Sequence, residues 1–202
     1  MNTIHPPALD TGSGIAIVPV TLDHAAMLAA LVREDREHLH TFLPPVATLT
    51  STEAARAHLE RAALSAQEGT IFEWHLFMDD TLCGSVRVRD IDLANRKAAI
   101  GYFLGSRFTG KGVVTAALQT VLAWCFGPLE LNRVELRCAT GNAPSIRVAE
   151  RLGFAREGLL RQDGSLNGVF VDHYVYGLLK AEFTSSPAPG AGTPSASPPS
   201  AS

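Results

Sequence analysis

The residues from Gly101 to Phe126 constrain the fold of this chain more than any other stretch. The run Gly101-Tyr-Phe-Leu-Gly-Ser-Arg-Phe-Thr-Gly-Lys-Gly112 predicts the end of a strand followed by a glycine-punctuated loop. The residues after it place apolar side chains on one helical stripe, namely Val114, Leu118, Val121, Leu122 and Cys125. A helix that starts directly after such a loop presents unpaired N–H groups and the positive end of its dipole, which favours phosphate. The alternative is an ordinary tight connection.

The rest of the chain alternates short apolar runs with amphipathic segments, which predicts one α/β domain. The expected strands are 15–20, 71–78, 82–88, 97–104, 133–139, 154–160 and 170–178, with hairpin turns at Asp79-Asp80 and at Asp163-Gly164-Ser165. The expected helices are 23–36 with Asp23 as N-cap, a short helix within 37–45, one reaching Gln67 from a Thr50–Glu53 capping box, 113–126, and 142–152 with Pro144 in its first turn. This order predicts a single mixed, largely antiparallel sheet of about seven strands.

Composition limits the classes of protein that need to be considered. Residues 1–14 are expected to be a flexible arm, residues 15–183 the folded domain, and residues 184–202, rich in Ser, Pro, Ala and Gly, a disordered tail. The net charge of −3 argues against a nucleic-acid partner. The three cysteines lie in apolar runs and fit a reducing compartment. Because no run is long enough to span a membrane and no secretion signal is visible, we expect a cytoplasmic protein.

The glycine loop nearly fits a nucleotide-triphosphate loop. Gly105 to Gly112 matches G-x-x-x-x-G-K-[ST] except at the last position, where the hydroxyl that holds magnesium is replaced by Gly112. The run Val169-Phe-Val-Asp172 offers an acid that could mimic a metal-binding strand. An NTPase therefore stays as a minor alternative.

The same loop also spells Arg107-x-x-Gly110-x-Gly112, which resembles the acetyl-coenzyme-A signature of GCN5-related N-acetyltransferases (GNAT). A second match to that family lies downstream in Asn142-Ala-Pro-Ser145 and Ala149-Glu-Arg-Leu-Gly-Phe154, with one helix and one strand between the two. Each match alone is weak, but their order and spacing agree with the family. The resemblance implies helices on both faces of the sheet and central strands that splay apart.

Further residues are similar to the RimJ/RimL branch of that family. They are Ile100-Gly-Tyr-Phe103, the segment 37–45 and Leu166-Asn-Gly168. The branch transfers an acetyl group from acetyl-CoA to N-terminal α-amines of ribosomal proteins, often as homodimers. We therefore expect an N-acetyltransferase that uses acetyl-CoA as co-substrate, without a metal, and acts on an α-amine of a protein or small molecule. A module that binds coenzyme A without catalysis is the main alternative.

The resemblance also implies which residues hold the donor. Main-chain groups of Phe103 and Leu104 would pair with pantetheine, and Asn142 would bind the same arm. Loop amides would hold the pyrophosphate, with charge from Arg107 or Lys111. The expected cofactor-binding residues are Phe103, Leu104, Arg107, Phe108, Thr109, Gly110, Lys111, Gly112, Val113, Asn142 and Ser145.

Ser145 is the candidate general acid, because the branch can place a hydroxyl there near the leaving thiolate. Helix capping is the alternative role for this serine. The general base is harder to assign, since the family's glutamate before Ile-Gly-Tyr is replaced by Ala99. Asp163 is the first candidate, followed by Glu73 and His75. The missing glutamate favours an acceptor of low pKa, because an α-amine is about a tenth neutral at pH 7, whereas a lysine is neutral far less often.

The acceptor pocket is expected to be lined by Phe42, Trp74 and Tyr102, although core packing also suits Trp74. His38 and His40 lie near that pocket in the branch but face different ways on a helix. The histidines show no shared spacing for a metal site.

Overall fold

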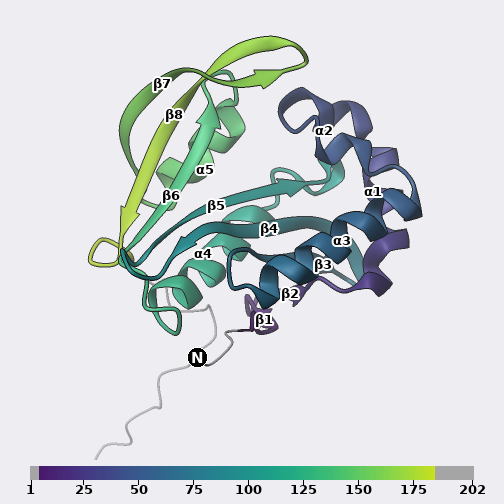
Figure 1. Ribbon diagram of the computed structural model, residues 1–202, viewed down its shortest axis with the longest axis horizontal. Coiled ribbons are helices and arrows are strands. Elements are labelled where there is room, and N and C mark those ends of the chain that lie inside the picture. The colour runs from purple at the N-terminus through teal and green to yellow at the C-terminus, as the bar shows by residue number, and fades with distance from the viewer. Residues whose placement is uncertain (1–4, 185–202) are drawn as a thin grey trace, which may run out of the picture.

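Among the described residues, one mixed sheet of eight strands has the order β1-β2-β3-β4-β5-β6-β8-β7. The computed structural model describes residues 5–184 (Figure 1). The strands are β1 (Leu9–Asp10), β2 (Ile15–Pro19), β3 (Phe72–Met78), β4 (Thr81–Asp92), β5 (Lys97–Leu104), β6 (Arg133–Ala139), β7 (Ala155–Leu166) and β8 (Val169–Leu179). All neighbouring pairs are antiparallel except β5 with β6. This confirms the predicted mixed sheet, and the strand beyond the expected seven is the short β1.

Helices cover both faces of the sheet. They are α1 (Ala25–Glu34), α2 (Arg36–Phe42), α3 (Thr52–Gln67), α4 (Val113–Phe126) and α5 (Ala143–Arg151), with short 3-10 turns at Leu22–His24, Val46–Thr48 and Ser106–Phe108. In Figure 1, α1 and α3 lie on one face of β2 to β5, whereas α4 and α5 lie on the other. Successive residues of β3 point to opposite faces of the sheet. Trp74 packs against Trp124 of α4 on one face, while Glu73 forms a hydrogen bond with His58 of α3 on the other.

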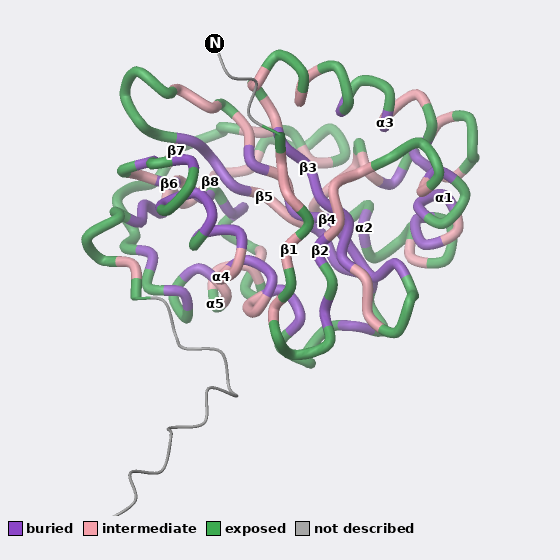
Figure 2. Tube along the Cα trace, turned by 90° about the horizontal axis from the view of Figure 1, so that it is seen from below, coloured by how far each residue is buried: buried purple, intermediate pink, exposed green. Residues whose placement is uncertain are grey.

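The helix predicted after the glycine loop is confirmed with its bounds. It begins at Val113, directly after Gly112, and ends at Phe126. The five residues of the predicted stripe are all buried, and the core continues from them into the sheet (Figure 2). The hydrophobic pattern predicted this helix correctly because α4 packs along its length against the sheet and α5.

The parallel pair in the middle of the sheet separates after four residue pairs. β5 and β6 are paired from Lys97↔Arg133 to Ile100↔Leu136, and no further. Beyond that point β5 stays with β4 up to Leu104, and β6 stays with β8 up to Ala139. Figure 1 shows the two strands starting together and diverging. This is the splay that the family resemblance implied.

The last hairpin turns later than the sequence analysis predicted. β7 continues through Asp163, Gly164 and Ser165, and the turn lies at Asn167-Gly168, whose φ angles are 54° and 81°. Asn-Gly is the preferred pair for a two-residue hairpin turn because both positions need left-handed backbone. The irregular pairing between Leu160 and Gly164 shows that Asp163 occupies a disturbed strand rather than a turn.

Two predicted helix caps and part of the N-terminal arm are also corrected. Ser51, not Thr50, caps α3, since its hydroxyl accepts from the Ala54 N–H at 3.2 Å. Asp23 lies inside a 3-10 turn rather than at the start of α1. The predicted flexible arm is ordered from β1 onward, where Leu9 and Asp10 pair with β2.

The predicted C-terminal tail lies outside the described residues from 185 onward. The last described residue, Thr184, accepts a hydrogen bond from Gln119 at 2.7 Å through its carbonyl. Within residues 5–184, no helix has the length and apolar character needed to cross a bilayer.

Replacing Leu118 by alanine is expected to lower the free energy of unfolding by about 3 kcal/mol, because the side chain is fully buried between α4 and the sheet. Urea denaturation followed by circular dichroism measures this. Leu64→Ala on α3 serves as the control, since Leu64 is 59% exposed and its loss should change stability by less than about 0.5 kcal/mol. Equal effects of the two substitutions would contradict the assigned core.

Candidate active site

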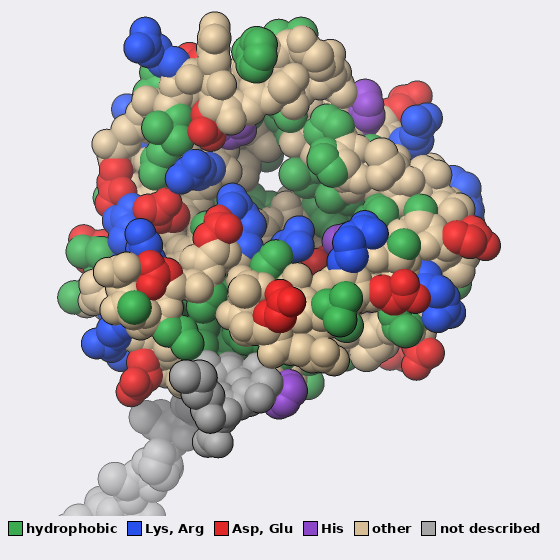
Figure 3. Space-filling view, viewed as in Figure 1, with side chains coloured by type: hydrophobic (Ala, Val, Ile, Leu, Met, Phe, Trp, Pro, Cys, Tyr) green, Lys and Arg blue, Asp and Glu red, His purple; other side chains and the backbone are tan. Residues whose placement is uncertain are grey.

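The splay between β5 and β6 opens a cleft of about 710 Å³. Figure 3 shows it as an opening into the middle of the molecule. Its walls come from α2, β5, the glycine loop with the start of α4, β6 and the start of α5. The wall residues include His38, Phe42, Arg89, Gly101, Tyr102, Phe103, Leu104, Phe108, Thr109, Gly110, Gly112, Val113, Val114, Thr115, Arg137, Cys138, Asn142, Ser145, Arg147, Arg151 and His173.

The glycine loop exposes main-chain donors at one end of the cleft. Gly110 and Gly112 have φ angles of 73° and 77°, and nothing lies within 4 Å of where a Cβ would stand. The first hydrogen bond of α4 runs from the Ala116 N–H to Gly112. The N–H groups of residues 113–115 therefore precede the helical ladder, and this end of the cleft can accept an anion.

The loop is anchored to the opposite wall by Asp35, which lies between α1 and α2. The Asp35 carboxylate accepts from the Ser106 N–H at 2.7 Å and from the Ser106 hydroxyl at 2.5 Å. A Cβ at Gly105 would stand 2.8 Å from this carboxylate and from Leu31. Glycine is therefore required at residue 105 for the close approach of the loop to α1.

The cationic residues in the cleft wall near the loop differ from those predicted. Arg107 and Lys111 flank the loop outside the cleft wall, with Arg107 over the Phe108 ring and 3.8 Å from Glu34. Arg147 and Arg151 of α5 line the cleft instead, and Arg151 reaches Thr115 at 3.4 Å. Sequence analysis missed this pair, although its spacing of four residues on a predicted helix was available.

Ser145 and Tyr102 form a hydrogen-bonded pair across the cleft, with their oxygens 2.8 Å apart. Ser145 does not cap α5, because the Asn142 side chain takes that role by accepting the Ser145 N–H at 3.2 Å. The alternative role considered for the serine is therefore filled by Asn142. Burial raises the pKa of Tyr102 to about 12, and the hydrogen bond with Ser145 only partly opposes this. The phenol is thus protonated at neutral pH and can donate.

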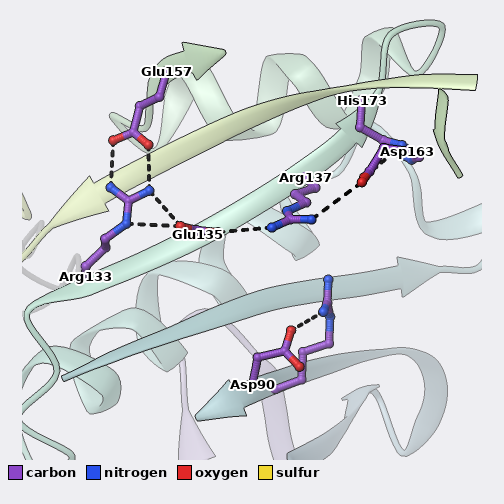
Figure 4. Close-up of polar contacts among 8 residues, drawn as sticks. Asp90, Arg133, Glu135, Arg137, Glu157, Asp163 and His173 are labelled. Atoms are coloured by element: carbon purple, nitrogen blue, oxygen red, sulfur yellow. Dashed lines mark hydrogen bonds and ion pairs between the residues drawn. The ribbon is translucent and has the colours of Figure 1, made fainter. Parts of the chain in front are cut away.

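A chain of charged side chains crosses β6, β7 and β8 on the opposite face of the sheet (Figure 4). Arg133 binds Glu157 through two hydrogen bonds of 2.6 and 2.5 Å and holds the pKa of Glu157 below its usual range. Glu135 links Arg133 to Arg137, whose guanidinium lies 3.8 Å from the Asp163 carboxylate.

Asp163 lies beside the cleft rather than in its wall. Its side chain is 28% exposed and stands 3.4 Å from Nδ1 of His173, which does line the cleft. The structure therefore brings the predicted acid to a histidine that sequence analysis did not select. Only the pairing of β7 with β8 reveals their contact.

Of the predicted acceptor-pocket residues, Phe42 and Tyr102 line the cleft and Trp74 does not. Trp74 is fully buried and donates to the Pro7 carbonyl at 2.8 Å. Its assignment to the pocket is corrected, because the even-numbered residues of β3 face α4 and the core. His38 lines the cleft, as the resemblance suggested.

Glu73 and His75, the further candidates for a base, are buried beneath α1 and α3 and outside the cleft wall. Glu73 accepts from His58 and Ser85, both at 3.1 Å. Burial alone would raise the pKa of Glu73, but the hydrogen bond and charge of His58 bring it below its usual value. His75 lies 3.0 Å from His24, nitrogen to nitrogen, and burial lowers its pKa to about 3.

The acid considered for an NTPase is also remote from the loop. Asp172 accepts the Gln162 N–H at 2.8 Å within the β7–β8 hairpin and is not part of the cleft wall.

Comparison with known proteins assigns the family. Residues 15–155 match the acetyltransferase (GNAT) domain. The chain belongs to the GNAT family.

Relatives and solved structures agree with this assignment. A putative ribosomal N-acetyltransferase, YdaF of Bacillus subtilis, is 44% identical over 108 residues, which are 54% of this chain and 59% of the relative. The ribosomal-protein-serine acetyltransferase of Escherichia coli is 29% identical over 157 residues, 78% of this chain and 88% of the relative. A RimL ribosomal L7/L12 α-N-protein acetyltransferase in complex with coenzyme A superposes with a TM-score of 0.82 at 25% identity, covering 86% of this chain and 98% of that one.

The buried His75 is expected to make this GNAT protein less stable in mild acid. Its pKa in the folded state is about 3 against an ordinary 6.5, so between these values the unfolded chain binds a proton that the folded chain does not. The free energy of unfolding should fall by about 2 kcal/mol from pH 7 to pH 5 because of this residue. Denaturation of wild type and His75→Gln across that range measures the difference.

His5→Gln is the control, because His5 is exposed at the N-terminus. The His75 variant should lose part of the pH dependence while the control keeps it. An unchanged slope in His75→Gln would contradict the assignment.

Proposed function

We propose that this protein is an N-acetyltransferase that moves an acetyl group from acetyl-CoA to an α-amine, such as the N-terminus of a ribosomal protein. The observation that carries the proposal is the cleft at the splay, which joins an anion-binding loop at one end to the Ser145–Tyr102 pair in the middle. GNAT membership and the coenzyme A bound by the similar RimL structure support it.

The groups in the cleft wall fit coenzyme A. The open space above Gly110 and Gly112 and the N–H groups of residues 113–115 suit the pyrophosphate. Arg147 and Arg151 supply positive charge for the phosphates. The unpaired ends of β5 and β6 offer main-chain groups to the amide-bearing pantetheine arm. Acetyl-CoA would supply an acetyl thioester, which is open to direct attack by an amine.

Ser145 and Tyr102 are suited to protonate the leaving sulfur. The serine hydroxyl can give its proton to the departing thiolate and take one from the Tyr102 phenol, which burial keeps protonated. We therefore assign Ser145 as the general acid and Tyr102 as its partner, rather than as a wall of the acceptor pocket.

An α-amine acceptor is favoured by the wall of the cleft next to α2. His38 and Phe42 line this side of the cleft, and β5 carries Ala99 in place of the carboxylate base that a lysine acceptor would need. The YdaF and Escherichia coli relatives are named for acetyl transfer to ribosomal proteins, putatively in the case of YdaF. A cytoplasmic location stays a prediction from the sequence, and a homodimer stays a prediction from the family resemblance.

The acceptor class can be tested by thiol release. At pH 7 a lysine-free peptide with an open N-terminus should react with a kcat/KM at least about 100-fold above that of an N-blocked peptide with one lysine, because far more of the α-amine is neutral. Comparable values would contradict an α-amine acceptor. No turnover with any amine, together with micromolar coenzyme A binding, would favour the non-catalytic binding module.

Ser145→Ala should lower kcat about 10- to 100-fold, because the thiolate then leaves without a positioned proton donor. Tyr102→Phe should have a similar effect, and the double substitution should be little worse than either, since the two hydroxyls act as a unit. Ser65→Ala on α3 is the control. Calorimetry should give unchanged coenzyme A affinity in Tyr102→Phe and Ser65→Ala, and an unchanged kcat in Ser145→Ala would exclude this acid.

A further inference from the structure

The cleft has a different chemistry on each side of the sheet. Tyr102 and Ser145 lie on the side covered by α4 and α5. His173 pairs with Ala139 of β6 and shares the other side with Arg137 and Asp163. Because successive strand residues alternate between faces, the splay places a proton donor on one side and an imidazole on the other. A thioester bound in the gap would have the proton donor and the imidazole nearby.

The imidazole of His173 lies beside a carboxylate. Its Nδ1 is buried and stands 3.4 Å from the Asp163 carboxylate without a hydrogen bond to it, and Arg137 lies 3.8 Å from the other oxygen of that carboxylate. A carboxylate beside Nδ1 favours the tautomer with the proton on that atom. Nε2 then keeps a lone pair, and His173 lines the cleft with 19% of its side chain exposed.

Gly164 makes room for this arrangement. A Cβ at residue 164 would stand 2.7 Å from Cε1 of His173, so the ring lies directly over the glycine. The φ angle of Gly164 is not in the left-handed region, and the glycine is therefore required for space rather than for backbone conformation. The irregular β7 pairing between Leu160 and Gly164 brings both Asp163 and this gap to the histidine.

We propose that His173 is the general base of the acetyl transfer and that Asp163 is the residue that positions it. The inference rests on the proposed N-acetyltransferase activity. It also accounts for Ala99, because the base comes from β8 instead of β5. Asp163, the carboxylate selected from the sequence, acts through the imidazole and does not touch the acceptor.

The proton balance of the step is complete. As the acceptor nitrogen forms its bond to the acetyl carbon, Nε2 of His173 takes a proton from that nitrogen. The carbon–sulfur bond breaks, and the sulfur takes a proton from Ser145, which is replenished through Tyr102 from solvent. The imidazolium, stabilised by Asp163, then releases its proton to water.

The test compares wild type, His173→Gln and Asp163→Asn with an α-amine peptide and acetyl-CoA. His173→Gln should lower kcat/KM about 100- to 1000-fold with unchanged coenzyme A affinity. Asp163→Asn should lower it by roughly tenfold, since the imidazole stays but loses its orientation. His40→Gln is the matched control, because this histidine is exposed on α2 and outside the cleft wall.

The pH profile separates catalysis from a structural role. On the acid side, log kcat/KM of wild type should fall with a slope of about two, because both the acceptor amine and the base must be neutral, and with a slope of about one in His173→Gln. The charged and titratable groups that face this histidine are Asp163 from β7, Arg137 from β6 and His38 across the cleft, with Asp172 next to it on β8. Asp163→Asn should keep the slope of about two, because the imidazole is still present.

Two further variants keep the inference falsifiable if His173→Gln folds poorly. Gly164→Ala should displace the ring and lower kcat with little change in thermal stability. His173→Ala should regain activity in proportion to added imidazole. A wild-type enzyme that turns over while His173→Gln keeps the same rate and the same slope would overturn this inference alone. A wild type without turnover on any amine would instead overturn the proposed function.

Discussion

The architecture of this protein depends on the short pairing of β5 with β6. Only four residue pairs join the two halves of the sheet, from Lys97↔Arg133 to Ile100↔Leu136, and each strand then follows its other neighbour. Two intact half-sheets therefore diverge around a gap whose walls are main chain on both sides. Every group assigned to the chemistry reaches this gap from a different element: Tyr102 from β5, Ser145 from α5 and His173 from β8. The splay thus takes the place of a conventional pocket, and Gly101, which has no side chain, lies in its wall.

The two ends of the cleft are built on different physical principles. At the loop, binding capacity comes from backbone conformation: left-handed glycines at 110 and 112 and the first turn of α4 provide donors that need no side chain. At the acceptor side it comes from side chains whose positions depend on strand register, including Arg137 and the contact between Asp163 and His173. The bond from Ser106 to Asp35 ties the loop to the α1–α2 junction, so the donor and acceptor walls share one support.

The difference between these ends explains what the sequence could and could not predict. The loop and α4 were predicted with correct bounds, because a periodic stripe and glycines of fixed spacing are local features. Asp163 was selected as an acid, but its partner His173 was missed. The turn was placed at Asp163-Gly164 instead of Asn167-Gly168, and the predicted register of β7 against β8 was therefore wrong. His173 has no local motif at all. Trp74 was assigned to the pocket because it is aromatic. Its place in the alternation of β3 directs its side chain into the core instead.

The unpaired facing edges of β5 and β6 have a consequence for the local opening motions of the sheet. Past Ile100 and Leu136, each strand presents main-chain groups to the gap that an ordinary sheet would satisfy with its neighbour. A ligand arm that bonds to them completes the sheet as a surrogate strand. Amide hydrogen exchange along residues 101–104 and 137–139 should therefore slow when the cleft is filled, which makes backbone protection a direct gauge of its occupancy.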